Sequence, residues 1–224
     1  MEKTQIASVA KSAKRIDKDD FILKLCAEKS VLDVGCIGQD RDFSSPHWLH
    51  NKIRKVSSRV DGVDILKEAV AKLKREGYSM YTVDELQKAN LTYDVVLLSE
   101  VIEHVDDPVA FMKFYSKFMS DKGVMFVSTP NSNRANNFIN ILFNNSYSVN
   151  PEHVFWFCPK TFAEAASRVP LKMDQFYWAN HYFNAESVTG VYQNFKLRLI
   201  NILISLRKNF SPNMIFLLKH QNGR

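Results

Sequence analysis

Short apolar runs alternate with segments of helical periodicity along most of the chain. The runs are rich in β-branched and aliphatic residues, as expected of buried strands, and they occupy residues 31–35, 59–65, 78–83, 93–99 and 124–129. Between them, apolar side chains recur at helical spacing in segments 44–56, 66–77 and 109–120. This alternation predicts an α/β fold, with a mostly parallel, doubly wound sheet and helices on both of its faces.

Several predicted helices are bounded by residues that start or stop helices. Ser45–Pro46 and Asp107–Pro108 each place a capping side chain before a proline suited to the first helical position. Gly77 is suited to end the helix that precedes it. Thr161 and Glu164 have the spacing of a capping box, which predicts a helix that begins there.

The strand and helix alternation breaks after Pro130. Eight of the twenty residues in 131–150 are Asn, a composition typical of a loop or a marginal helix. An insertion at this point follows the fifth predicted strand on the side of the sheet where ligands bind. We therefore expect residues 131–160 to form a lid or part of a substrate pocket.

The remaining segments complete a single domain over residues 1–224. The C-terminal part, 161–224, is predicted to add strands at 171–183 and 213–219 and a helix over 188–209, which gives a seven-stranded sheet. We expect residues 1–29 to form N-terminal helices that precede the first strand.

Composition and charge narrow the classes of protein that fit this pattern. The chain has 224 residues, is 46% apolar and carries 30 basic against 24 acidic residues, a net charge of +6. The charges are scattered, which argues against nucleic acid as a partner. Three Cys without CxxC spacing indicate a reducing compartment, and no signal peptide or spanning run of apolar residues is visible, so we expect a cytoplasmic protein.

Polar side chains and glycines follow three of the predicted strands at the point where each strand ends. They are the turn from Asp33 to Gly38, the carboxylate of Asp64, and the segment 99–108, which reads SEVIEHVDDP. A glycine turn lets the backbone approach a ligand closely, and an acid at the second position can accept both hydroxyls of a ribose. Their order and spacing predict a nucleoside-binding site at the carboxyl edge of the sheet.

These motifs resemble those of the class I S-adenosylmethionine (SAM)-dependent methyltransferases. VLDVGC at 31–36, VDGVDI at 60–65 and YDVVLLSEVIEHVDDP at 93–108 are similar to three motifs of that family, and GVMFVSTPN at 123–131 is similar to its fifth strand. The third stretch is typical of the branch that contains ubiquinone-biosynthesis O-methyltransferases and relatives acting on sugars and natural products. The resemblance implies a Rossmann-like methyltransferase fold and SAM as the cofactor.

The resemblance also implies a role for each matching residue. The methionine end of SAM would be lined by Asp33, Gly35, Cys36 and Gly38. The adenosine would be held by Asp64 at the ribose and by Ile65 at the adenine, and the sulfonium region would face Ser99 and Glu100.

One departure from the family pattern affects the first motif. Ile37 and Gln39 stand where the family usually has its second and third glycines, and Gly38 lies between them. A β-branched side chain tolerates positive φ poorly, so the loop must differ from the family form. A non-catalytic scaffold protein that has lost SAM binding is therefore an alternative to an enzyme.

Glu100, Glu103 and His104 allow three interpretations. At helical spacing the three side chains share one face, and with His153 they would make a plausible divalent metal site, as is thought for some relatives. Without a metal, His104 can serve as the general base, with Glu103 assigned beside it at the catalytic centre. We favour the base, and a purely structural His104 is the third alternative. A metal-assisted RNA 2′-O-methyltransferase is the alternative enzyme.

The acceptor is the least defined part of the site. We expect methyl transfer to oxygen, or with less support nitrogen, of a small-molecule, sugar or lipid-linked acceptor, with part of the aromatic set in 155–157 and 176–183 lining its pocket. Segment 196–210 combines an apolar stripe with basic flanks, which suits peripheral contact with a membrane. A core-packing helix is the favoured reading of that segment. The oligomeric state is left open.

Overall fold

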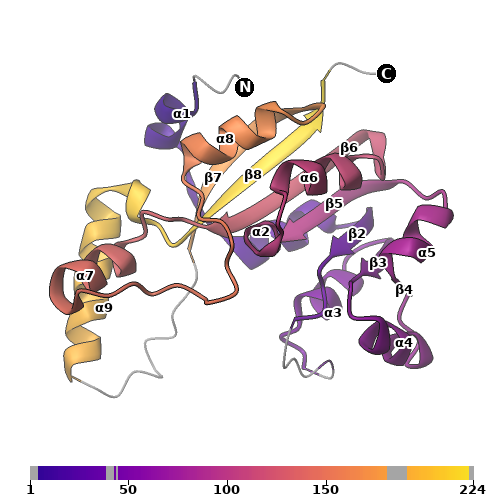
Figure 1. Ribbon diagram of the computed structural model, residues 1–224, viewed down its shortest axis with the longest axis horizontal. Coiled ribbons are helices and arrows are strands. Elements are labelled where there is room, and N and C mark those ends of the chain that lie inside the picture. The colour runs from indigo at the N-terminus through magenta and orange to yellow at the C-terminus, as the bar shows by residue number, and fades with distance from the viewer. Residues whose placement is uncertain (1–4, 39–42, 44, 181–190, 222–224) are drawn as a thin grey trace.

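The computed structural model describes residues 5–38, 43, 45–180 and 191–221, and an eight-stranded sheet forms its centre (Figure 1). The strand order is β1-β7-β8-β6-β5-β2-β3-β4. Strand β8 runs antiparallel to both of its neighbours, and every other pair is parallel. The predicted mostly parallel, doubly wound α/β fold is therefore confirmed, with eight strands in place of seven.

The elements follow one another in nearly regular alternation. The strands are β1 Arg15–Asp17, β2 Ser30–Val34, β3 Arg59–Val63, β4 Met80–Tyr81, β5 Tyr93–Ser99, β6 Met119–Pro130, β7 Leu171–Asn180 and β8 Asn213–His220. The helices are α1 Ile6–Ser12, α2 Lys18–Cys26, α3 Leu49–Arg54, α4 Lys67–Arg75, α5 Val83–Lys88, α6 Pro108–Ser116, α7 Ala135–Asn144, α8 Pro159–Ser167 and α9 Val191–Leu206. Short 3-10 turns cover Ile102–His104 and Lys208–Phe210.

The eighth strand lies in the segment that was expected to hold only helices. β1 pairs in parallel with the end of β7, in the register Arg15 to Trp178. Helix α2 begins directly after β1, and the side chain of Asp17 caps it by accepting from the N–H of Asp20 at 2.8 Å. Three residues are too few to show strand periodicity, which is why the sequence pattern did not reveal β1.

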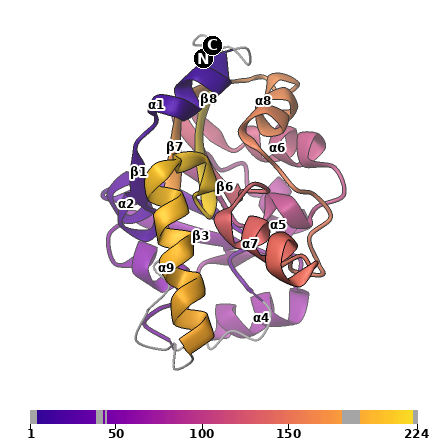
Figure 2. The same ribbon diagram turned by 90° about the vertical axis from the view of Figure 1, so that its left-hand side faces the viewer.

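Helices cover the sheet on both faces (Figures 1 and 2). One apolar core joins the sheet to α1, α6 and α8 and includes Met112, Phe162 and Trp178. A second core on the opposite face joins the sheet to α2 and α3 through Ile22 and Ile53. Both cores consist of side chains that are almost fully removed from water, which is the main source of stability for a fold of this kind.

Two predicted helix starts are wrong. Helix α3 begins at Leu49 and not near Ser45, because the Trp48 indole is buried and donates to the carbonyl of Cys36 at 2.8 Å. Helix α8 begins at Pro159 after Cys158, and the hydroxyl of Thr161 accepts from the N–H of Cys158 at 2.9 Å. Thr161 thus lies inside the first turn and is not the cap.

The insertion after β6 contains a helix and reaches a distant part of the chain. Helix α7 forms within the Asn-rich segment and packs its Ala135 and Ile139 against Ile200 of α9. Figures 1 and 2 show α7 and α9 side by side at one end of the molecule. Residues 181–183 of the predicted aromatic strand lie outside the described residues. In the described part of the chain, no helix has the length and apolar character needed to cross a bilayer.

Candidate active site

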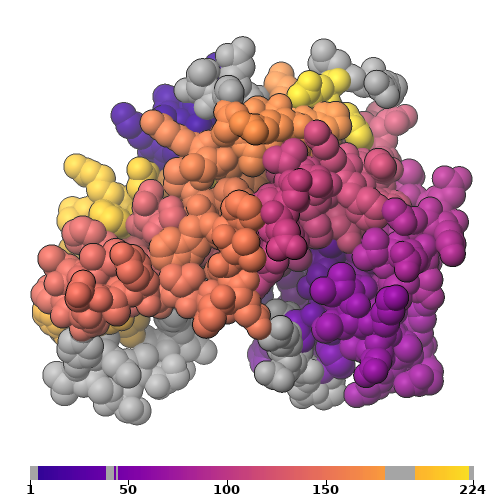
Figure 3. All heavy atoms as spheres, in the orientation of Figure 1, coloured from indigo at the N-terminus to yellow at the C-terminus, as the bar shows by residue number. Residues whose placement is uncertain are grey.

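A cavity of about 890 Å³ opens at the carboxyl edge of β2, β3 and β5. The surface is hollowed between the orange-coloured segment and the purple elements in Figure 3. The predicted cofactor residues and one predicted catalytic residue line it: Asp33, Gly35, Cys36, Gly38, Asp64, Ile65, Ser99, Glu100 and His104. The acids Asp33 and Asp64 therefore share one hollow, as the nucleoside-site prediction requires.

The turn after β2 depends on glycine at position 35. Gly35 has φ +66° and donates its N–H to the carbonyl of Val63 at 2.9 Å. A Cβ at this position would lie 2.7 Å from Cγ2 of Val101, too close for a side chain. Asp33, just before it, is buried and lies 2.9 Å from Nδ1 of His50. With no side chain at Gly35, the backbone of this turn itself lines the cavity.

Ile37 leaves the cavity open even though it contributes to the wall. Its side chain is buried in an apolar cluster with Trp48, Val70 and Met80. Its backbone N–H donates to Oδ2 of Asp64 at 2.9 Å. The loop thus accommodates the β-branched residue without placing it in the ligand space. Gln39, the second departure from the family pattern, lies outside the described residues.

Asp64 holds the second strand end and the first turn together. Besides the bond from Ile37, its Oδ1 accepts from the N–H of Leu66 at 3.1 Å. Burial raises the pKa of Asp64 above its ordinary value, and these backbone donors act in the opposite direction. Ile65 follows with 79% of its surface exposed at the cavity wall, so an aliphatic surface is available beside the carboxylate.

Glu100 is paired with a buried cation that the sequence did not single out. Its backbone has φ +55°, and its Oε1 accepts from Oγ of Ser128 at 2.7 Å. The same oxygen lies 3.3 Å from Nζ of Lys18, the first residue of α2, which is 5% exposed. Lys18 and Ser99 both line the cavity, and Oγ of Ser99 lies 3.3 Å from Oγ of Ser128. A charged pair therefore faces the ligand space.

Glu103 differs from its neighbours in the motif because its side chain is buried away from the cavity. Neither carboxyl oxygen has a hydrogen-bond partner in the described part of the chain. Burial, and next the charge of Glu100, raise the pKa of Glu103 to about 8. Its backbone carbonyl accepts from the N–H groups of Val154 and Phe155 at 2.8 and 3.1 Å. These bonds connect the segment after β5 to the insertion after β6.

The expected single face of Glu100, Glu103 and His104 does not form. Residues 102–104 make a 3-10 turn, and the left-handed backbone of Glu100 directs that side chain to Lys18. His153 of the insertion joins the other two instead, and potential ligand atoms of Glu103, His104 and His153 all lie within 4.8 Å of one another. This set contains one carboxylate and two imidazoles, which are donors that divalent metals accept.

The two histidines of this set also act on each other. The rings of His104 and His153 meet edge to face with their centroids 4.6 Å apart. Burial and the nearby His104 lower the pKa of His153. A pKa below the ordinary value of 6.5 keeps the His153 imidazole neutral at neutral pH.

Sequence reasoning missed several residues of the cavity wall. They are Lys18, Trp48, His50, Phe111 and Tyr115. Lys18 stands in an acidic stretch, KDD, that is typical of an exposed helix start, and only the tertiary packing reveals its burial. Tyr115 lies on the inner face of α6, where burial raises the pKa of its phenol. From the sequence alone, an aromatic residue at helical spacing in a cavity wall cannot be distinguished from one in the core.

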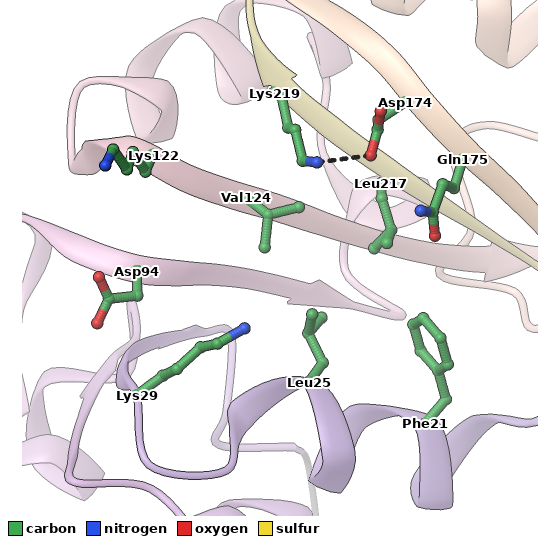
Figure 4. A pocket seen from close by; sticks show the side chains of 10 residues that line it. All are labelled: Phe21, Leu25, Lys29, Asp94, Lys122, Val124, Asp174, Gln175, Leu217 and Lys219. Atoms are coloured by element: carbon green, nitrogen blue, oxygen red, sulfur yellow. Dashed lines mark ion pairs between the residues drawn. The ribbon is translucent and has the colours of Figure 1, made fainter.

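A second cavity, of about 530 Å³, lies on the sheet face beside α2 (Figure 4). Its floor is apolar, with Phe21, Leu25 and Leu217, and its rim carries the ion pair between Lys219 and Asp174 at 2.8 Å. None of the predicted site residues lies in it. The chemistry expected from the sequence thus belongs to the larger cavity.

Comparison with known proteins points to the same chemistry. A family model described as a methyltransferase domain matches residues 11–175. A ubiquinone biosynthesis O-methyltransferase of Neisseria meningitidis is 30% identical over 129 residues, which are 53% of this chain and 51% of that protein. One from Vibrio cholerae is 35% identical over 114 residues, covering 47% and 43% of the two chains. The chain thus spans about half the length of the curated relatives it matches.

Solved structures share the fold at low sequence identity. A SAM-dependent methyltransferase from Archaeoglobus fulgidus superposes with a TM-score of 0.54 at 18% identity, covering 89% of this chain and 90% of that one. An S-adenosylmethionine-dependent methyltransferase from Clostridium acetobutylicum gives a TM-score of 0.54 at 12% identity and covers 91% of each chain. These likenesses support the Rossmann-like architecture.

Proposed function

Because the chain belongs to the class I SAM-dependent methyltransferases, we propose that it transfers a methyl group from SAM to an oxygen of a small-molecule acceptor. The observation that carries the proposal is the shared cavity, in which the Asp33 turn, the Asp64 carboxylate and Glu100 face one space. The geometry of these strand ends matches what a nucleoside with a charged tail needs.

The residues present fit SAM along its whole length. The exposed Ile65 offers an apolar surface to the adenine, and the Asp64 carboxylate keeps a lone pair free for the ribose hydroxyls beyond its backbone bonds. At the other end, the Gly35 turn allows close approach of the backbone. Lys18 supplies a cation for the α-carboxylate, and the acids Asp33 and Glu100 complement the α-ammonium and the sulfonium.

SAM supplies a methyl group that is already activated by the positive sulfur, so the protein contributes alignment and proton removal. His104 lines the cavity, and its ring meets His153, whose lowered pKa favours the neutral form. A neutral imidazole at this point can accept the proton of an acceptor hydroxyl. Glu103 is assigned a positioning role, because its buried carboxyl lies within 4.8 Å of ring nitrogens of His104 and His153.

The acceptor is assigned by class. The named relatives are ubiquinone biosynthesis O-methyltransferases, which supports oxygen over nitrogen as the methylated atom. Asn150 and Glu152 of the insertion line the cavity together with the strand ends, which supports residues 131–160 as part of the acceptor site. Sugar and lipid-linked acceptors belong to the same proposal, since each presents a hydroxyl.

Metal-assisted methyl transfer is the second candidate, and one observation favours it. Glu103, His104 and His153 bring three potential ligand atoms together beside the cavity. A divalent ion held there would polarise adjacent hydroxyls of an acceptor. Elemental analysis of the purified protein and titration with a chelator separate the two candidates. Full activity in chelator, with no bound metal, would eliminate the metal.

Calorimetry with S-adenosylhomocysteine tests the proposed function directly. We expect binding in the micromolar range, and Asp64→Ala should weaken it at least tenfold because the variant loses the ribose carboxylate. A screen of hydroxylated acceptors with methyl-labelled SAM then identifies the substrate. Failure of the wild type to bind at high micromolar concentration would favour a non-catalytic scaffold instead.

A further inference from the structure

Exposed apolar side chains are concentrated at one end of the molecule. We define the α7–α9 lobe as residues 131–149 and 191–210, which lie together at the left of Figure 1. Of the eleven large hydrophobic residues that the described chain exposes, eight belong to this lobe: Phe138, Ile141, Leu142, Phe143, Tyr147, Phe195, Ile202 and Leu206. Two others, Ile65 and Leu66, line the active-site cavity.

The exposed residues of α9 form a continuous stripe. Phe195, Ile202 and Leu206 are separated by seven and four residues, so they lie on one side of the helix, and they are 63%, 53% and 62% exposed. Another side of α9 packs on α7 through Ile200 and Leu203. The helix is thus apolar on its inner and outer surfaces, which indicates that the outer surface has a partner.

All charged side chains of the lobe are basic. It contains five basic residues, Arg134, Lys196, Arg198, Arg207 and Lys208, and no Asp or Glu, so it carries +5 of the chain's net +6. Arg198 stands three residues after Phe195 and four before Ile202, within the exposed stripe, and is exposed itself. No described acidic residue forms an ion pair with Arg198 or Arg207. Basic residues beside exposed apolar side chains are typical of helices that bind a surface with anionic groups outside and apolar groups beneath them.

We propose that the α7–α9 lobe docks onto the surface of an anionic phospholipid bilayer. The stripe of Phe195, Ile202 and Leu206 enters the boundary between headgroups and acyl chains, while Arg198 and Arg207 bind headgroup phosphates. Helix α9 has 16 residues, fewer than a spanning helix needs, so it lies in the interface plane. The sequence favoured a core-packing helix for this segment, and the exposure of its outer surface now favours the alternative.

The docked orientation has a consequence for the active site, which rests on the proposed function. The insertion that begins with α7 continues to Asn150 and Glu152, which line the cavity. Docking of α7 and α9 therefore holds the acceptor side of the cavity near the headgroups. An acceptor with a lipid tail would reach it without leaving the membrane.

Vesicle sedimentation of the full chain tests the docking without any turnover. We expect the wild type to sediment with vesicles of phosphatidylcholine and phosphatidylglycerol in equal parts, to stay in solution with phosphatidylcholine alone, and to be released by added NaCl. The double variant Ile202→Asp/Leu206→Asp should weaken binding about tenfold or more, since it removes apolar area and adds two repelled charges. Arg198→Glu/Arg207→Glu should also weaken it by about tenfold or more.

A matched variant separates this surface from general charge attraction. Lys67→Glu/Arg75→Glu makes the same change in net charge on exposed positions of α4, away from the lobe in Figure 1. It should retain most of the vesicle binding. Calorimetry with S-adenosylhomocysteine shows whether each variant is folded, and its failure in the wild type would count against the proposed function alone.

Three results would overturn the docking. One is the absence of sedimentation with anionic vesicles, and another is an equal loss of binding in the α4 control. The third is a concentration-dependent dimer in analytical ultracentrifugation that Ile202→Asp/Leu206→Asp abolishes, with no vesicle binding. That result would assign the exposed stripe to a second copy of the chain.

Discussion

Burying a lysine in a cavity wall costs free energy unless its ammonium group has an anionic partner or ligand. Lys18 has Glu100 as its partner at 3.3 Å, and both groups face the space that the methionine end of SAM would occupy. In the proposed binding mode, Lys18 meets the α-carboxylate of the cofactor and Glu100 meets its sulfonium. We therefore expect Lys18 to bind the α-carboxylate of SAM.

Replacement of Lys18 by Met tests that role. Calorimetry should show affinity for S-adenosylhomocysteine about tenfold to a hundredfold lower, because a charge-assisted bond is lost. Affinity for methylthioadenosine, which has no amino-acid tail, should stay within about threefold of wild type. An equal loss for both ligands would mean that Lys18 only supports the fold.

Proton removal from the acceptor is proposed for the His104 ring, which lines the cavity. His104→Ala should lower kcat by about a hundredfold or more, while affinity for S-adenosylhomocysteine is retained. Steady-state kinetics with methyl-labelled SAM measures the loss of turnover. Wild-type turnover in the variant would contradict the base.

Gly35 carries the backbone conformation of the first turn. Gly35→Ala should destabilise the protein by about 1–3 kcal/mol, since φ is +66° and the new methyl would meet Val101. Gly77→Ala is a matched control, because Gly77 has φ +84° but nothing within 4 Å of the added Cβ. Denaturant unfolding should show the larger loss at Gly35, and equal losses would disprove the steric argument.

At the scale of elements, the strands were predicted more accurately than the helices. Strands β2 and β5 are continuous aliphatic runs, and such runs have few alternatives when both sheet faces are covered. Helix α3 starts late because a tertiary contact of Trp48 overrides the local signal at Ser45. Helix α7 forms in an Asn-rich segment because Ala135 and Ile139 gain a partner in α9, far along the chain.

Helix α5 escaped prediction although its start has a clear capping box. Thr82 and Glu85 exchange bonds with each other's backbone N–H, and Glu85 also pairs with Lys74 at 2.6 Å. Thr82→Ala should cost about 1 kcal/mol of unfolding free energy. Thermal or denaturant unfolding measures the loss, and an unchanged midpoint would show that α5 does not need the cap.

The same cap gives a pH dependence. The bonds from Lys74 and Thr82 lower the pKa of Glu85 from 4.5 to about 2. Because the pKa of Glu85 is lower in the folded than in the unfolded state, ionised Glu85 stabilises the fold at every pH above about 4.5. This contribution to the free energy of unfolding is lost as pH falls from about 4.5 towards 2. Glu85→Gln should remove that part of the acid slope of stability.

For the molecule as a whole, the motif order was enough to predict the fold class and the shared nucleoside cavity. Each motif follows a strand, and parallel strands bring their carboxyl ends to one edge. The partners of Glu100 and Glu103 could not be predicted in this way, because Lys18 and His153 come from segments about 80 and 50 residues distant in sequence. The catalytic assignments of Glu103 and His104 remain predictions.

Ligand binding should stabilise the whole domain. At a S-adenosylhomocysteine concentration about a hundred times its Kd, the gain is about 2.7 kcal/mol, which corresponds to a Tm increase of about 5–10 °C for a domain of this size. Differential scanning fluorimetry measures the shift. NAD should produce none, because the chain lacks the dinucleotide glycine pattern. Equal shifts with both ligands would contradict a site built for SAM.

The position of β8 between β6 and β7 has a consequence for how the protein is made. Residues 213–220 pair with both neighbours, so the two halves of the sheet stay unjoined until this segment has left the ribosome. During synthesis the nascent chain exposes two unpaired strand edges, which are sites of aggregation. Chaperones that cover exposed strand edges would therefore protect the nascent chain until β8 pairs with both neighbours.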